Sequence, residues 1–142
     1  MKSFAASILI DATPETVWKI LTDGAGWVSW NPTIEKLDGE ISPGAKVTVY
    51  PKGSSGRAFP VRVSEFVPPR RMVWTGGMPL GLFKGERTYT LTPRDGGVEF
   101  AMREGFSGLL SPLIARSIPD LRPSFDEFVA ALKRRAEQRA PG

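Results

Sequence analysis

The sequence contains no cysteine and no histidine among its 142 residues. Without these side chains the chain cannot form a Ser-His-Asp triad, a cysteine nucleophile or a zinc site of the usual kind. It also lacks a Gly-Lys-Ser/Thr phosphate loop and a Gly-x-Gly-x-x-Gly motif. Any catalysis must therefore depend on carboxylates, tyrosine, lysine, arginine or bound water, and we expect no metal and no cofactor.

The sequence also has no apolar run near the ~18 residues of a transmembrane helix. The N-terminal segment reaches Asp11 too soon for a secretory signal. Together with the lack of cysteine, these absences lead us to expect a cytoplasmic protein without stable membrane insertion. The net charge is only +4, and the densest basic patch, residues 133–139, has no interleaved aromatic side chains. We therefore expect a solvated helix end there and no nucleic-acid partner.

The hydrophobic fraction of 41% is enough for one core, so we expect residues 1–142 to form a single domain. Residues 4–10 read as a strand. A helix start follows, because Thr13 can cap a helix and Pro14 suits its first position. A second short helix or turn carries Trp27 and Trp30.

Six further strands are predicted by alternating apolar residues between turn signals, at residues 34–37, 45–50, 57–66, 72–75, 83–91 and 98–106. Their short connections favour an antiparallel meander. The last third changes to a helical period, with apolar residues at Ile114, Ile118, Leu121, Phe125, Phe128 and Leu132. Pro119 and Pro123 should divide or kink the beginning of this long helix. The predicted fold is α+β, a curved seven-stranded antiparallel sheet wrapped around the C-terminal helix.

The last two strands are joined by Asp95-Gly96, a strong signal for a two-residue hairpin turn. With this turn, Arg94 pairs with Gly97 and Arg87 lies opposite Glu104. Both charged residues interrupt faces that are otherwise apolar, and an apolar face should point inward. The sequence thus predicts one cation opposite one anion on the interior surface of the sheet.

Two interpretations of this pair stay open. It is either a structural ion pair, buried or reaching water at the strand end, or a polar anchor for a ligand in an apolar pocket. Tyr89 and Met102 follow on the same face, and a buried tyrosine hydroxyl needs a partner or a ligand. Glu65 is expected to be exposed, while the face of Trp74 depends on a register that the sequence does not determine.

Two apolar segments are candidates for a gate over such a pocket. Residues 76–83 contain three glycines beside Leu80, and residues 109–114 contain Leu110 and lead into the long helix. Apolar loops are unfavourable in water unless they pack on something or move to admit something. Packing of the two segments on each other is the alternative.

Several segments of the chain, in this order, resemble the START/polyketide-cyclase superfamily of helix-grip domains, often labelled SRPBCC. The segments are Ile10-Asp11-Ala12-Thr13-Pro14-Glu15-Thr16-Val17-Trp18, Leu21-Thr22-Asp23, Trp27-Val28-Ser29-Trp30-Asn31-Pro32, Val63-Ser64-Glu65-Phe66-Val67-Pro68-Pro69-Arg70, Met72-Val73-Trp74 and Glu104-Gly105-Phe106-Ser107-Gly108-Leu109-Leu110. The resemblance implies a hydrophobic ligand cavity between sheet and helix. It does not name the ligand.

Three functions follow from these observations. The first is binding of a hydrophobic small molecule, such as a lipid, polyketide or isoprenoid-like compound. The second is an aromatase/cyclase-type enzyme, in which Arg87 polarises a carbonyl and Glu104 or Tyr89 moves protons. The third is a protein-binding module of the co-chaperone type. The predicted ligand-binding residues are Arg87, Glu104, Tyr89, Met102, Trp74, Phe106, Leu80 and Leu110.

Overall fold

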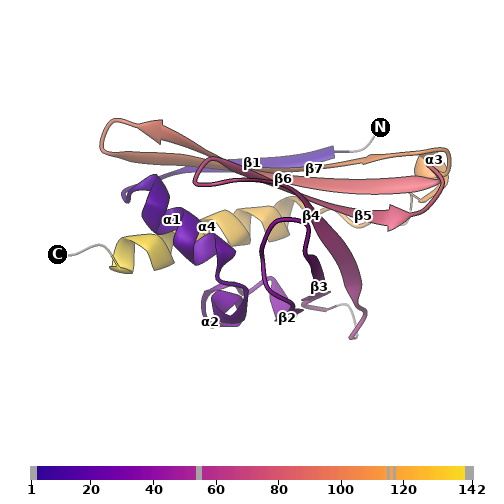
Figure 1. Ribbon diagram of the computed structural model, residues 1–142, viewed down its shortest axis with the longest axis horizontal. Coiled ribbons are helices and arrows are strands. Elements are labelled where there is room, and N and C mark those ends of the chain that lie inside the picture. The colour runs from indigo at the N-terminus through magenta and orange to yellow at the C-terminus, as the bar shows by residue number, and fades with distance from the viewer. Residues whose placement is uncertain (1–2, 54–55, 115, 117, 140–142) are drawn as a thin grey trace.

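The computed structural model describes residues 3–53, 56–114, 116 and 118–139 (Figure 1). Its strands are β1 (Ser3–Ile10), β2 (Ile34–Asp38), β3 (Lys46–Pro51), β4 (Phe59–Val67), β5 (Arg71–Met78), β6 (Phe83–Arg94) and β7 (Gly97–Ser107). Its helical elements are α1 (Pro14–Thr22), the 3-10 turn η1 (Gly24–Gly26), α2 (Trp27–Trp30), α3 (Ser111–Ile114) and α4 (Arg122–Arg139).

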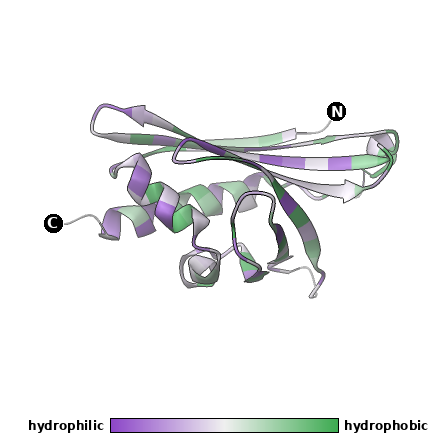
Figure 2. Cartoon of the chain, viewed as in Figure 1, coloured by the Kyte–Doolittle hydropathy of each residue, from purple (hydrophilic) through white to green (hydrophobic). Residues whose placement is uncertain are grey.

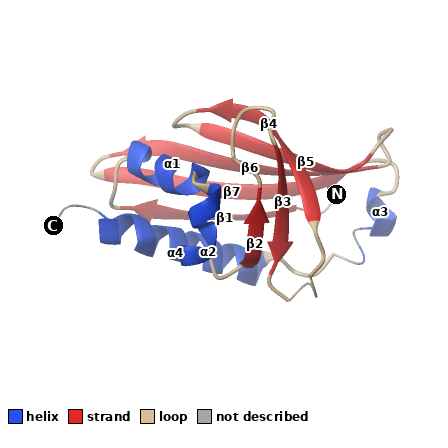
Figure 3. Ribbon diagram, turned by 60° about the horizontal axis from the view of Figure 1, so that its bottom comes forward, coloured by secondary structure: helices blue, strands red, loops and turns tan. Residues whose placement is uncertain are grey.

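The seven strands form one antiparallel sheet in the order β1-β7-β6-β5-β4-β3-β2, which confirms the predicted architecture. Strands β2 to β7 follow one another as a meander, and β1 closes the far edge beside β7. The helices α1 and α2 carry the chain from one edge of the sheet to the other. Figures 1 and 3 show α1, α2 and α4 gathered on the same side of the curved sheet, so the core lies between these helices and the sheet.

The start of α1 follows from its cap. Thr13 has an extended backbone, its Oγ1 accepts a hydrogen bond from the Thr16 backbone N–H at 3.0 Å, and Pro14 occupies the first turn. The chain then turns through η1 into α2. There the indole Nε1 of Trp27 donates to the carbonyl oxygen of Leu21 at 2.9 Å. This bond satisfies the one polar atom of a fully buried tryptophan.

The register of the last hairpin is the predicted one. The pairs of β6 and β7 include Arg94 with Gly97, Leu91 with Phe100, Tyr89 with Met102 and Arg87 with Glu104. Gly96 has φ +77°, in the left-handed region that glycine adopts without penalty. The two-residue turn therefore sets which side chains of both strands face the core.

Aromatic rings fill the space between the sheet and α4. The Trp27 ring lies 5.3 Å from the rings of Trp74 and Phe128 and 6.4 Å from that of Tyr89. Phe128, on α4, also lies 6.0 Å from Phe100 on β7. These contacts join α2, the sheet and α4 in one ring cluster, and Figure 2 shows hydrophobic residues on α1 and α4.

The C-terminal helix differs from its prediction. Instead of one helix carrying the whole apolar stripe, α3 ends at Ile114 and α4 begins at Arg122. Ile118 and Leu121 precede α4 and pack on the core from outside it. Proline lacks an N–H and clashes with the preceding turn, so Pro119 prevents one continuous helix. The expectation that prolines divide the beginning of the helix is confirmed.

The predicted apolar loop at residues 76–83 is also shorter than expected. Strand β5 extends to Met78, which pairs with Phe83, so only residues 79–82 lie outside the hairpin. Glycine-rich sequence favoured a loop, but backbone pairing with β6 overrides that preference. Within the described ranges, no helix is long and apolar enough to cross a membrane.

The ring cluster predicts a large loss of stability for Phe128→Ala. Phe128 is 2% exposed, and removing a buried ring costs about 3–5 kcal/mol. The matched control is Phe59→Ala, because Phe59 is 43% exposed at the start of β4. We expect it to cost less than about 1 kcal/mol, as measured by urea unfolding. Equal losses at the two positions would contradict the assigned core.

Candidate functional site

The predicted charged pair lies in a row of side chains that crosses five strands. Trp74 on β5 pairs with Arg87 on β6, which pairs with Glu104 on β7, which pairs with Phe4 on β1. Val63 on β4 extends the row beyond Trp74. Val63, Trp74 and Phe4 are buried. The row thus places two charges in the middle of an apolar surface.

The two charges form an ion pair that faces the interior. Arg87 Nε donates a hydrogen bond to Glu104 Oε1. The guanidinium carbon of Arg87 also lies 5.0 Å from the ring centroid of Phe125 on α4, a cation–π contact. Nevertheless, 28% of the Arg87 side chain and 16% of the Glu104 side chain remain exposed. Solvent therefore still reaches this inward-facing pair.

Burial and the neighbouring groups shift the pKa of Arg87 in opposite directions. Burial by itself would lower the pKa of Arg87, but its interactions with Glu104 and Tyr89 together outweigh burial, and the pKa of Arg87 is raised. Arg87 is therefore a permanent cation. The site offers a ligand a fixed positive charge whose anionic partner is already in place.

The Tyr89 hydroxyl is a third polar group on this face. Burial raises the pKa of Tyr89, and attraction to the nearby Arg87 guanidinium only partly opposes that shift. Among the described residues, no hydrogen bond of good geometry reaches this buried hydroxyl. A buried hydroxyl without a partner is costly, so Tyr89 is available to a ligand or a water molecule.

The structure places the remaining predicted residues in two groups. Trp74, Met102 and Phe106 are buried on the inner face, and Phe106 stacks on Phe83 with ring centroids 5.8 Å apart. Leu80 and Leu110 lie away from the anchor, in the two candidate gate segments. These segments do contact each other, because the Leu110 backbone N–H donates to the Leu82 oxygen at 2.7 Å.

Glu65 points away from the core, as expected. A bulge between Val63 and Glu65 shifts the register of β4, and Arg71 Nε donates to Glu65 Oε1 at 3.0 Å. The exposure expected for Glu65 is thus confirmed. The bulge lies at Ser64.

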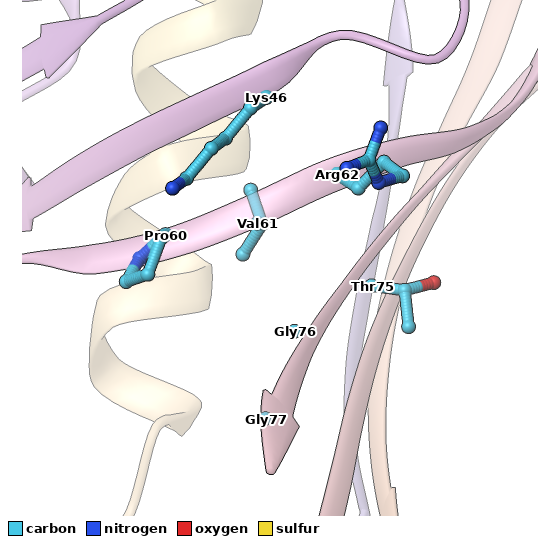
Figure 4. Close-up of a pocket in the computed structure, with 7 residues that line it drawn as sticks. All are labelled: Lys46, Pro60, Val61, Arg62, Thr75, Gly76 and Gly77. Carbon is cyan, nitrogen blue, oxygen red and sulfur yellow. The ribbon is translucent and has the colours of Figure 1, made fainter. Parts of the chain in front are cut away.

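Two open pockets lie elsewhere on the sheet. The first, about 210 Å³, opens where β4 and β5 separate, and Figure 4 shows Lys46, Arg62 and Gly76 among its lining residues. The second, about 630 Å³, is lined mostly by outward-facing residues of β1, β6 and β7 and includes Met102. The predicted cavity between sheet and α4 is neither of these pockets and stays a prediction.

Sequence reasoning missed the burial of the polar residue Asn31. Asn31 is 2% exposed, and its Oδ1 accepts hydrogen bonds from the backbone and hydroxyl of Thr33, whereas its Nδ2 has no partner in the described structure. The only signal was an asparagine before Pro32, which indicates a helix end and not burial. The described residues contain no group of three acidic side chains placed to hold a metal ion.

Solved structures resemble this chain over nearly its whole length. A protein from Mesorhizobium loti superposes with a TM-score of 0.76 at 20% identity, covering 99% of this chain and 100% of that one. The Zhui aromatase/cyclase from a Streptomyces species gives 0.78 at 13% identity, covering 99% and 96%. The di-domain aromatase/cyclase StfQ of the steffimycin biosynthetic pathway gives 0.73 at 16% identity, covering 97% of this chain and 52% of that one.

At these identities the structural likenesses establish the helix-grip fold and not the activity. No curated protein sequence matches the chain. The family assignment comes from sequence, because the profile of one family matches residues 1–137. The chain belongs to the family described as polyketide cyclase / dehydrase and lipid transport.

Proposed function

We propose that the protein binds a hydrophobic small molecule that carries one polar group. The apolar part would lie between the inner face of the sheet and α4. The polar group would meet Arg87, Glu104 and the Tyr89 hydroxyl. Family membership supports this class of ligand, and the single domain expected for residues 1–142 would hold the whole site.

The observation that carries the proposal is an ion pair beside an unsatisfied hydroxyl on an apolar face. Burying two charges costs several kcal/mol per ion, and an apolar pair in the same place is often as stable. Stability is therefore a weak reason for Arg87 and Glu104 to be there. Binding of a ligand that accepts a hydrogen bond from Arg87 or Tyr89 would explain why these polar groups lie on an apolar face.

The neighbouring side chains indicate where the apolar part of the ligand would lie. On the Tyr89 side of the anchor, the ring cluster occupies the interior. On the other side, Gly85 contributes no side chain, and Phe83 and Phe106 stack beside it. We therefore expect the ligand to extend from Arg87 toward Phe106, with Trp74 at its flank. Leu80 and Leu110 would act at the mouth.

A second candidate is ring closure of the aromatase/cyclase type, favoured by the three polar groups that converge here. Arg87 would donate a hydrogen bond to a ketone oxygen while the Glu104 carboxylate removes a proton from the attacking carbon. A C–C bond would then form, and Tyr89, which burial keeps protonated, would supply the proton for the new alkoxide. Removal of a second proton and departure of the new hydroxyl as water would complete the aromatic ring, so a product one water lighter than a poly-ketone mimic would favour this reaction over simple binding.

A protein-binding role is the third candidate, since apolar side chains are exposed at the gate segments. It predicts that an apolar dye finds no saturable site inside the protein. Native mass spectrometry of protein purified from its own cells distinguishes the three candidates. A retained small molecule would also name the ligand.

We predict that Arg87→Met lowers affinity for polar-headed ligands. A hydrogen bond to a charged group is worth about 1.5–3 kcal/mol, so a long-chain carboxylic acid should lose about tenfold or more in affinity. The corresponding hydrocarbon should displace an environment-sensitive dye from the variant as well as it does from the parent protein. Dye displacement titrations measure both.

The double variant Arg87→Met/Glu104→Leu separates binding from folding. The single variant leaves Glu104 without its partner and should lose about 1–3 kcal/mol of stability, whereas the double variant should recover most of it. The loss of preference for the acid should persist. If the double variant binds the acid as tightly as the parent does, the pair is structural only.

Tyr89 gives a spectroscopic test of its environment, because the sequence has only two tyrosines. In a Tyr50→Phe background, the phenol absorbance should report Tyr89 alone. Since the folded-state pKa is raised above 10.0, the folded protein favours the neutral phenol, and stability should fall as pH rises beyond 10.0. Ionisation at or below that pH in the folded protein would contradict the buried site.

A further inference from the structure

The end of the molecule formed by the β5–β6 turn and α3 exposes four large apolar side chains, which we call the leucine tip. Their exposed fractions are 94% for Leu80, 79% for Leu109, 66% for Leu113 and 48% for Met78. Figure 1 places α3 beside the ends of β5 and β6, and Figure 2 shows this end as hydrophobic. Soluble proteins rarely gather such side chains at one exposed point unless it contacts something.

The backbone holds the leucine tip in this arrangement. The Leu109 N–H donates to the Gly81 oxygen at 3.0 Å, and the Ser111 N–H donates to the Gly108 oxygen at 3.0 Å. Gly108 has φ +110°, and a Cβ there would lie 2.8 Å from the Leu82 oxygen, so close approach of the two segments needs glycine. The exposed leucines are therefore presented by paired backbone.

Leu80 is the most informative member. Its φ is +61°, the one positive value at a non-glycine position in the described part of the chain. The left-handed conformation is unfavourable for leucine, and this leucine is also almost fully exposed. Leu80 and Gly81 (φ +69°) form the centre of a turn that is closed by the Leu82 N–H donating to the Pro79 oxygen at 3.2 Å, so the hairpin accounts for the backbone conformation. It does not account for an exposed leucine where Asn, Asp or Gly would cost less, which points to a contact outside the molecule.

Charge favours one kind of surface. Residues 76–85 and 105–119 contain no aspartate or glutamate, and their charged residues are Lys84 and Arg116. Lys84 contacts Glu86 at 3.4 Å, and Arg116 is exposed. With a net charge of +4 on the chain, this end should approach an anionic surface more readily than a cationic one.

Shape favours the same surface. Each partner in a stable protein interface buries about 800 Å² of its surface. Four side chains at a narrow tip supply less than this area. A lipid bilayer accepts separate apolar side chains without complementary shape, and its anionic headgroups attract basic residues nearby. A second protein copy is therefore the weaker explanation.

We propose that the leucine tip docks on an anionic lipid bilayer, with Leu80, Leu109 and Leu113 entering its interfacial region. This is peripheral contact by side chains and not insertion of a helix. It goes beyond ligand binding, and it holds whatever molecule the interior accepts. The docked end is the one toward which we expect the ligand to extend. The ligand could therefore pass between the protein and the bilayer without crossing water.

Binding to vesicles tests the proposal directly. The full chain should co-float with phosphatidylcholine vesicles containing phosphatidylglycerol, and binding should weaken with added salt or without the anionic lipid. In Leu80→Ser/Leu109→Ser, vesicle affinity should fall at least about tenfold for each leucine removed. The matched control is Leu9→Ser, because Leu9 is 62% exposed but pairs with Glu99, far from the tip.

The absence of native cysteine allows a second measurement. An environment-sensitive dye on Leu80→Cys should shift its emission to the blue with anionic vesicles, while the same dye on Leu9→Cys should not. Both positions are exposed, so unchanged thermal unfolding should accompany every variant. The Leu80 dye also reports docking if the double serine variant fails to fold.

Three results would overturn the proposal. The parent could remain in solution with all vesicles, or Leu9→Ser could reduce binding as much as the tip variant does. The parent could also self-associate on size-exclusion chromatography and become monomeric in Leu80→Ser/Leu109→Ser, which would assign the tip to a second copy. None of these outcomes would alter the interior ligand tests, so failure of docking is distinguishable from failure of the proposed binding.

Discussion

The register of the β6–β7 hairpin is the constraint on which the site depends. In a strand, neighbouring side chains point to opposite faces, so a slip of one residue between β6 and β7 would put Arg87 and Glu104 on opposite faces of the sheet. The two-residue turn at Asp95-Gly96 prevents that slip. The turn therefore fixes the pairing of Arg87 with Glu104, although both residues lie about seven residues from it along their strands.

The ion pair divides the interior into two parts with different roles. Toward the hairpin turn, the rings of Trp27, Tyr89, Phe100 and Phe128 pack on one another, and this part provides stability. Toward α3, the stacked rings of Phe83 and Phe106 lie beside Gly85, and solvent reaches the pair. A binding site is easier to maintain where the fold does not depend on dense packing, because stability is supplied elsewhere.

Capping residues, turn residues and apolar alternation predicted the local structure well. They did not predict the three-dimensional packing. The Thr13 cap, the strand order and the pairing of Arg87 with Glu104 all follow from turn chemistry and alternation. The predicted helical stripe begins at Ile114, whereas α4 begins at Arg122, because an apolar period of three and four persists through Pro119, where a helix cannot. The ring cluster and the buried Asn31 were missed, since volume and burial arise from contacts between distant segments. Ligand contact by the predicted residues stays a prediction.

The two apolar features of the molecule contribute differently to stability, and this difference links the site to the leucine tip. Rings buried against α4 stabilise the fold by leaving water. The leucines at the tip remain in water in the folded protein, so their apolar surface does not stabilise the fold, and Leu80 adopts a backbone conformation that is unfavourable for leucine. If the tip docks on a bilayer, this apolar surface leaves water only in the docked state. A hydrophobic ligand would then arrive at the end of the molecule toward which we expect it to extend from Arg87.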